Sequence, residues 1–154
     1  MVPPLFARHT DGRLQRMNKE NRKQKELEKR MARVWQSYAA FPKEKQAELT
    51  DHTFSFHLDD IGAGWEYVHF VLDGESFGFR ISYIGPDVSS FVSSAVSLGK
   101  KDSLIFTWYD EPGEYTWTFS RRDDVVYIEA PFRKQGFFLN YGYFSSQILD
   151  GARK

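Results

Sequence analysis

Residues 106–119, FTWYDEPGEYTWTF, hold two short runs in which large apolar and polar residues alternate. A period of two is typical of strands, because successive side chains of a strand point to opposite faces of a sheet. Pro112 and Gly113 between the runs have the composition of a type II turn over 111–114, whose third position needs a positive φ. The stretch therefore predicts an antiparallel hairpin, in which Trp108 can form cross-strand aromatic pairs with residues of the returning strand, namely Tyr115, Trp117 and Phe119.

Three carboxylates surround the predicted turn, at Asp110, Glu111 and Glu114. A general acid/base pair requires one carboxyl group to be held in an apolar environment, which raises its pKa, while the other stays ionised. The tip of a solvent-exposed turn does not offer that environment. The three acids are therefore interpreted as the polar tip of a hairpin and not as a catalytic pair.

Both flanks of this hairpin continue in alternating runs, interrupted by stretches with helical spacing. Strands are predicted at 53–58, 64–72, 76–84, 103–109, 114–120, 124–130 and 137–140. Asp73-Gly74 is a strong hairpin signal between the second and third of these strands. Helices are predicted at 42–49, at 86–100 with Gly99 as its C-cap, and at 141–154. This order predicts an α+β fold with a mostly antiparallel sheet and helices packed on one face.

Charge divides the chain into two parts, although the net charge of the whole chain is zero. Residues 1–50 hold twelve Lys/Arg against six Asp/Glu, whereas residues 51–154 hold nine against fifteen. We therefore expect a basic N-terminal helical arm, 1–50, joined to an acidic α+β domain, 51–154. The first ten residues are expected to be a disordered lead-in to this arm.

Apolar residues form a single face only in the second half of the arm, which predicts that this half docks on the domain. The residues on that face are Leu27, Met31, Val34, Trp35 and Tyr38. The first half is interpreted as a solvated helix with ion pairs between neighbouring turns, such as Glu26 with Arg30. The first alternative function is nucleic-acid binding by the arm, since clustered cations neutralise phosphates. The residues predicted for it are Arg16, Arg22, Lys23, Lys25 and Lys29.

Several classes of site are disfavoured by residue content. The absence of cysteine excludes disulfides, thiolate nucleophiles and cysteine-based zinc sites. His57 and His69 are expected to meet on neighbouring strands near Asp59 or Asp60, but their spacing enforces no metal site, so no metal or cofactor is predicted. We expect a chain that is not an enzyme; a small-ligand binder or enzyme built around these histidines is the second alternative. No run of about 18 apolar residues occurs, so a soluble, cytoplasmic protein without membrane contact is expected.

Acidic residues recur where the predicted strands end. Turns favour Asp for local hydrogen bonding, which explains each of these residues singly. Together with aromatic side chains they would also suit a basic protein partner, because acidic rims steer association and aromatic anchors supply binding energy. The predicted partner-binding residues are Asp59, Asp60, Trp65, Asp110, Glu111 and Glu114.

Two motifs carry a resemblance to a known group of proteins. SYIG at 82–85 and WYDEPGEYTW at 108–117 resemble small bacterial α+β proteins, some of which are encoded beside secreted toxins and act as immunity proteins. The resemblance covers roughly residues 65–130 and leaves the arm outside. It implies a bacterial binding protein that neutralises a toxin, here a basic one, by occluding it. It identifies no binding residue, and the oligomeric state stays open.

Overall fold

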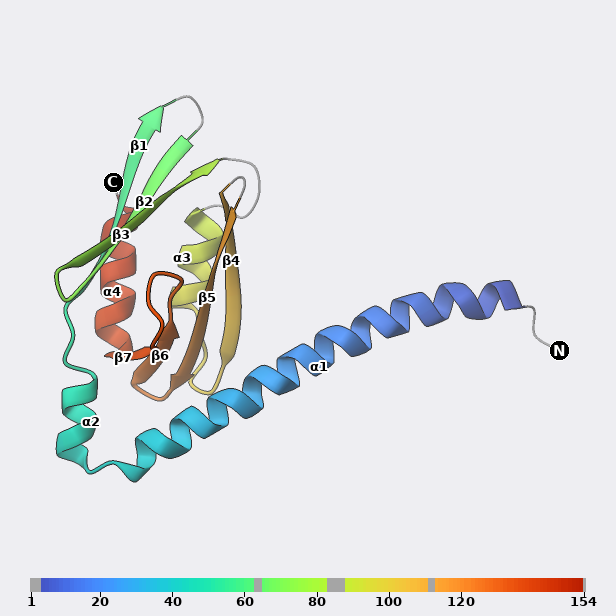
Figure 1. The fold of residues 1–154 in the computed structure, drawn as a ribbon, viewed down its shortest axis with the longest axis horizontal. Helices are drawn as coiled ribbons and strands as arrows, with labels where there is room; N and C mark the ends of the chain where they lie inside the picture. Colours follow the sequence, from blue (N-terminus) through green and yellow to red (C-terminus); the bar gives the residue numbers. More distant parts are fainter. Residues whose placement is uncertain (1–3, 63–64, 83–87, 111–112, 154) are drawn as a thin grey trace.

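The computed structural model describes residues 4–62, 65–82, 88–110 and 113–153, and their side chains except those of 4–14, 60–62, 65, 82, 109 and 110. The described residues form four helices and seven strands in an α+β arrangement, as predicted (Figure 1). The helices are α1 (Pro4–Ala40), α2 (Lys43–Leu49), α3 (Val88–Val96) and α4 (Tyr141–Ala152). The strands are β1 (Phe54–Gly62), β2 (Trp65–Leu72), β3 (Glu75–Ser82), β4 (Ser103–Asp110), β5 (Gly113–Arg122), β6 (Val125–Glu129) and β7 (Phe137–Asn140).

The strands form two antiparallel sheets and not the single sheet that was predicted. The first sheet has the order β1-β2-β3 and the second the order β4-β5-β6-β7. Each sheet is built from consecutive hairpin-connected strands, whereas the chain passes through α3 between β3 and β4. Because α3 replaces a tight turn at that point, β4 begins a second sheet beside the first (Figure 1).

Both predicted hairpins form, with one change in a turn. Asp73 and Gly74 adopt positive φ values of 51° and 85°, as a two-residue turn with the twist of the flanking strands requires. In the β4–β5 hairpin, Trp108 lies opposite Tyr115, which confirms the predicted cross-strand aromatic pairing. Gly113, however, pairs with Asp110 as the first residue of β5. Gly113 therefore belongs to the strand and not to the interior of the predicted turn, and residues 111–112 lie outside the described residues.

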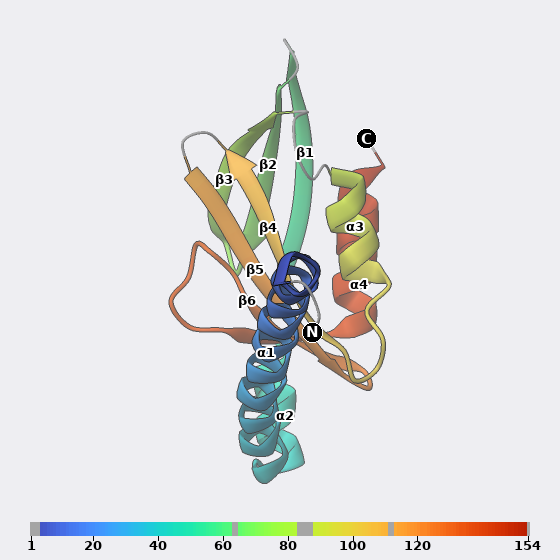
Figure 2. The ribbon, with the colours of Figure 1, turned by 90° about the vertical axis from the view of Figure 1, so that its right-hand side faces the viewer.

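An aromatic core fills the space between the two sheets and the helix pair α3–α4. Figure 2 shows α3 and α4 side by side along one side of the sheets. The largest side chains with no exposure are Trp108, Trp117, Phe70, Phe91, Phe119 and Phe144. Each such ring buries on the order of 150–250 Å². The core therefore holds the fold together without disulfides.

Helix α4 covers the free edge of β1. The Tyr143 hydroxyl accepts a hydrogen bond from the Phe54 N–H at 2.9 Å and donates one to the Phe54 carbonyl at 3.0 Å. At the penultimate position of the helix, Gly151 lies so close to β1 that a methyl group there would overlap the carbonyl oxygen of Phe56. An edge strand with unpaired backbone groups invites pairing with other chains, and α4 prevents this for β1.

Two helix ends differ from the prediction. Helix α1 begins at Pro4 within the segment expected to be a disordered lead-in, and proline is tolerated in the first turn of a helix. Helix α3 ends at Val96, so Gly99 is not its C-cap. The Tyr141 hydroxyl instead donates to the Ala95 carbonyl at 2.7 Å and accepts from the Leu98 N–H at 3.1 Å. A tertiary contact with Tyr141 thus supplies hydrogen bonds to backbone groups at the C-terminal end of α3.

We expect Gly151→Ala to lower the free energy of unfolding by about 1–3 kcal/mol, because the added methyl group forces α4 away from β1. Gly142→Ala in the same helix is the matched control, since its methyl group would meet only the Asn140 side chain, at 3.3 Å. That change should be neutral or stabilising by up to about 1 kcal/mol, because alanine favours helix over glycine. Urea denaturation followed by circular dichroism measures both. Equal effects would contradict the close packing of α4 on β1.

Candidate functional site

The predicted partner-binding residues lie at the ends of strands from both sheets. Residues 59 and 60 lie near the end of β1, Trp65 begins β2, Asp110 ends β4, and Glu114 lies at the start of β5. Figure 1 shows these strand ends together at the upper end of the molecule, which we call the acidic end. The structure therefore brings residues from two sheets to one region.

Three carboxylate side chains of the acidic end are described: those of Asp59 and Glu114, which are exposed, and that of Glu66, which is partly buried. The side chains of Asp60, Trp65 and Asp110, and the whole of Glu111, lie outside the described residues. Arg80, two residues before the end of β3, lies at this end as well and lowers its net negative charge. The other acidic turns, at Asp73 and at Asp123-Asp124, lie toward the opposite end, near α1 and α2 (Figure 1). The strand-end acids therefore do not form a single rim.

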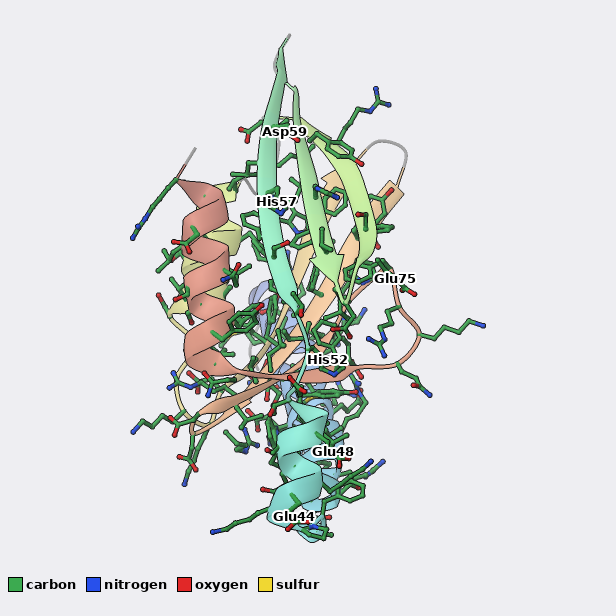
Figure 3. All side chains as sticks on the ribbon, turned by 90° about the vertical axis from the view of Figure 1, so that its left-hand side faces the viewer. Glu44, Glu48, His52, His57, Asp59 and Glu75 are labelled. Atoms are coloured by element: carbon green, nitrogen blue, oxygen red, sulfur yellow. The ribbon has the colours of Figure 1, made fainter. Side chains whose placement is uncertain are left out.

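The outer face of the first sheet brings the two strand histidines together, as predicted. His57 and His69 are direct partners across β1 and β2, with ring centroids 5.4 Å apart. Tyr67 stacks on His69, and its ring occupies the space above Gly78. Figure 3 shows His57 and Asp59 along β1. Among the described residues no group of three His, Asp or Glu side chains could hold a metal ion.

The second half of α1 docks on the outer face of the second sheet. Leu27, Met31 and Trp35 are buried there against side chains of β6 and β7. The Trp35 indole N–H donates to the Ser120 hydroxyl at 2.8 Å, and Ser120 lies 2.7 Å from the Ser103 hydroxyl. The predicted docking of the arm by its C-terminal half is confirmed by this contact.

An ion pair between α1 and β6 replaces the predicted Glu26–Arg30 pair. The Arg30 guanidinium lies 2.6 Å from both carboxylate oxygens of Glu129. The Tyr127 hydroxyl donates to the same carboxylate at 3.2 Å. Burial, together with the negative charge of Glu129, raises the pKa of Tyr127 to about 12. Arg30 pairs with Glu129 because docking brings that carboxylate to the side of α1 on which Arg30 lies.

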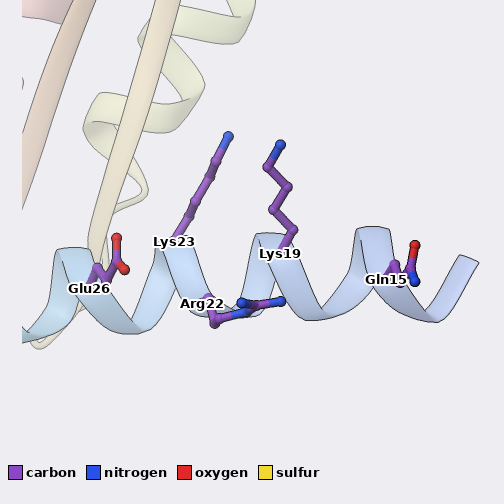
Figure 4. A pocket seen from close by; sticks show the side chains of 5 residues that line it. All are labelled: Gln15, Lys19, Arg22, Lys23 and Glu26. Atoms are coloured by element: carbon purple, nitrogen blue, oxygen red, sulfur yellow. The ribbon is translucent and has the colours of Figure 1, made fainter. Parts of the chain in front are cut away.

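The first half of α1 leaves the body of the protein. Every side chain from residue 15 to residue 26 is exposed. The amide of Gln24 donates to the Ser103 carbonyl at 3.2 Å, and from Gln24 toward the N-terminus α1 projects away from the sheets (Figure 1). Figure 4 shows Lys19 and Lys23 on one side of this projecting segment and Arg22 on the other. All five residues of the predicted nucleic-acid-binding set, Arg16, Arg22, Lys23, Lys25 and Lys29, are exposed.

A pocket of about 420 Å³ lies where α1, α2 and the β5–β6 turn meet. It is lined by Trp35, Tyr38, Ala39, Gln46, Arg122, Asp123, Asp124 and Val125. The Arg122 guanidinium lies 5.8 Å from the centre of the Trp35 ring and donates to the Lys101 carbonyl at 3.1 Å. Burial raises the pKa of Tyr38. Sequence reasoning missed this pocket, because Trp35 and Tyr38 are some ninety residues from the acidic turn.

No protein family, curated protein or solved structure matches this chain. The resemblance to immunity-type proteins stays a prediction. Of the described helices, none combines the length and the apolar character needed to cross a bilayer.

Stability at high pH should depend on Tyr127. Its pKa is about 12 in the folded protein, against about 10 in an unfolded chain. Between these values the unfolded chain loses the tyrosine proton first, so the free energy of unfolding falls as the pH rises. Tyr127→Phe should make this fall less steep, as measured by urea denaturation at several pH values between about 9 and 12. Glu129→Gln should lower the pKa of Tyr127, and an unchanged pKa by ultraviolet titration would contradict the contact.

Limited trypsin digestion should distinguish the two halves of α1. Cleavage after Arg16, Lys19, Arg22, Lys23 and Lys25 should precede cleavage within residues 51–154, because few apolar contacts hold the projecting segment. Mass spectrometry of early time points identifies the sites. Protection of the projecting segment in the free protein would mean that it is covered in solution.

Proposed function

We propose that this chain is a protein-binding module that captures a basic partner through its acidic end and blocks the partner by occupying its surface. The observation that carries the proposal is the gathering of the β1–β2 and β4–β5 strand ends in one region (Figure 1). In its finer form, which the resemblance implies, the partner is a bacterial toxin and the chain is its cytoplasmic immunity protein.

The strands hold the acidic end in a fixed arrangement. Asp59 lies opposite Tyr67 in the β1–β2 ladder, and Glu114 lies opposite Tyr109 in the β4–β5 ladder. Backbone positions held in a ladder lose little conformational freedom when a partner binds. Strand positions therefore support binding better than the same carboxylates would on a free loop.

The charge of the domain supports a basic partner. Residues 51–154 hold nine Lys/Arg against fifteen Asp/Glu, a net charge of −6. A surface of one sign raises the association rate of an oppositely charged protein, and this effect weakens with ionic strength. Trp65, at the start of β2 in the same region, is of the residue type most often found as a binding anchor.

Charge reversal at the two exposed carboxylates, Asp59 and Glu114, tests the proposal. The partner is first identified by crosslinking the wild-type protein in a lysate of the cells that produce it, and is then purified. Asp59→Lys with Glu114→Lys should slow association at least about tenfold in surface plasmon resonance, because charge complementarity governs the on-rate. The wild-type rate should fall as the Debye length shrinks from about 10 Å at 0.1 M salt to about 3 Å at 1 M salt.

The matched control reverses two exposed carboxylates of α2, at the other end of the molecule (Figure 3). Glu44→Lys with Glu48→Lys changes the net charge of the chain by the same amount. Association rates that are equal for the two double variants would show that net charge alone acts, and that the acidic end is not the contact surface. Circular dichroism should be unchanged in both, since exposed charges contribute little to stability.

A further inference from the structure

The projecting half of α1, together with the first turn of its docked half, carries an excess of cations. Residues 15–29 hold six Lys/Arg against three Glu. None of these six side chains forms an ion pair with any carboxylate that the structure describes. The ion pair that α1 does form uses Arg30, at the docked part of the helix. The six side chains are therefore available to an anionic partner.

The six cations cover about half of the circumference of the helix. At about 100° per residue, Lys23 and Lys25 lie roughly 160° apart around the axis, with Arg22 between them. Met31, which is buried against the sheet, falls on the side opposite Arg22. Arg22, Lys25 and Lys29 therefore face away from the body, whereas Lys19 and Lys23 point to the side on which the body lies (Figure 4), and Lys23 lines a pocket with Leu27 and Ile105.

The major groove of B-form DNA matches this arrangement. A helix with its side chains is about 10–12 Å across, and the groove is about 12 Å wide with phosphates along both rims. Cations on opposite flanks can then contact the two backbones, while Arg22 and Gln15 face the base edges between them. From Pro4 to Gln24 the projecting segment spans about 30 Å, enough to cross a groove.

Other anionic partners fit less well. Residues 15–26 contain no aromatic side chain on which the bases of a single strand could stack. Met17 is the one large apolar residue of residues 15–26, so this part of the helix lacks the apolar face that a membrane surface requires. The deep, narrow major groove of an RNA duplex excludes a helix.

We propose that the projecting half of α1 binds double-stranded DNA in the major groove. This goes beyond the proposed capture of a basic protein, and it uses a different part of the chain. The division of charge along the chain agrees with DNA binding by α1. The body has a net charge of −6, and in the proposed complex it lies on the side of α1 away from the DNA phosphates.

Fluorescence anisotropy with a labelled DNA duplex of about 20 base pairs tests the proposal on the full-length chain. The wild-type protein should bind, and the logarithm of its affinity should fall with the logarithm of salt concentration by about 0.9 per phosphate contacted. Changing Arg22, Lys23, Lys25 and Lys29 to Gln should lower affinity at least about tenfold and reduce this slope by about 3–4. Glutamine keeps a helix propensity close to that of the replaced residues.

The matched control changes four exposed lysines elsewhere, Lys43, Lys100, Lys101 and Lys134, to Gln. It should alter affinity less than about threefold, because those lysines do not face the groove. No binding of the duplex at low salt, or equal losses in the two quadruple variants, would overturn the proposal.

An RNA duplex of the same sequence should bind more weakly, and equal or tighter binding would overturn the major-groove assignment. Tighter binding of polyglutamate would indicate an acidic protein partner instead. None of these results affects the test of the acidic end.

Discussion

The packing of Phe70 against Trp117 holds the two sheets of this protein in one arrangement. Their ring centroids lie 4.5 Å apart, and Phe91 of α3 packs against both at 5.9 Å. In the described chain no backbone ladder joins the first sheet to the second, so side-chain packing decides how they meet. Large rings suit this task, because each buries a large area while losing few rotamers. The relative positions of all strand ends follow from this contact.

The acidic end and the docking face of α1 are two consequences of this core. One face of the second sheet is occupied by the aromatic core, which leaves its outer face free for Leu27, Met31 and Trp35. The same packing directs the β1–β2 and β4–β5 hairpins to one end of the molecule. The surface proposed for a protein partner and the root of the arm are therefore held on a common rigid frame, in different regions of the protein.

Helix α1 is continuous but lies in two different environments. Its second half is anchored by apolar burial and by the Arg30–Glu129 ion pair, whereas its first half is surrounded by solvent. A short polar helix alone is marginal in water because its nucleation is costly. The docked half supplies that nucleus, and the helix extends from it by adding one hydrogen bond per residue. The projecting cations are thereby held in a fixed order around the helix axis.

The sequence by itself determined the local elements: the hairpin at Asp73-Gly74, the pairing of Trp108 with Tyr115, the closing helix from Tyr141, and the apolar face of α1. Periodicity and turn composition suffice for these, because they depend on backbone conformation and near neighbours. Only the tertiary structure decided that the strands form two sheets, that Arg30 pairs with Glu129 and not Glu26, that Tyr141 caps α3, and that the Trp35 pocket forms. Each of these depends on which surfaces meet across long stretches of chain, and several partners of similar chemistry compete for each contact. Packing of the aromatic core decides which of these partners meet, because it fixes the distances between helices and strands that the local sequence pattern does not determine.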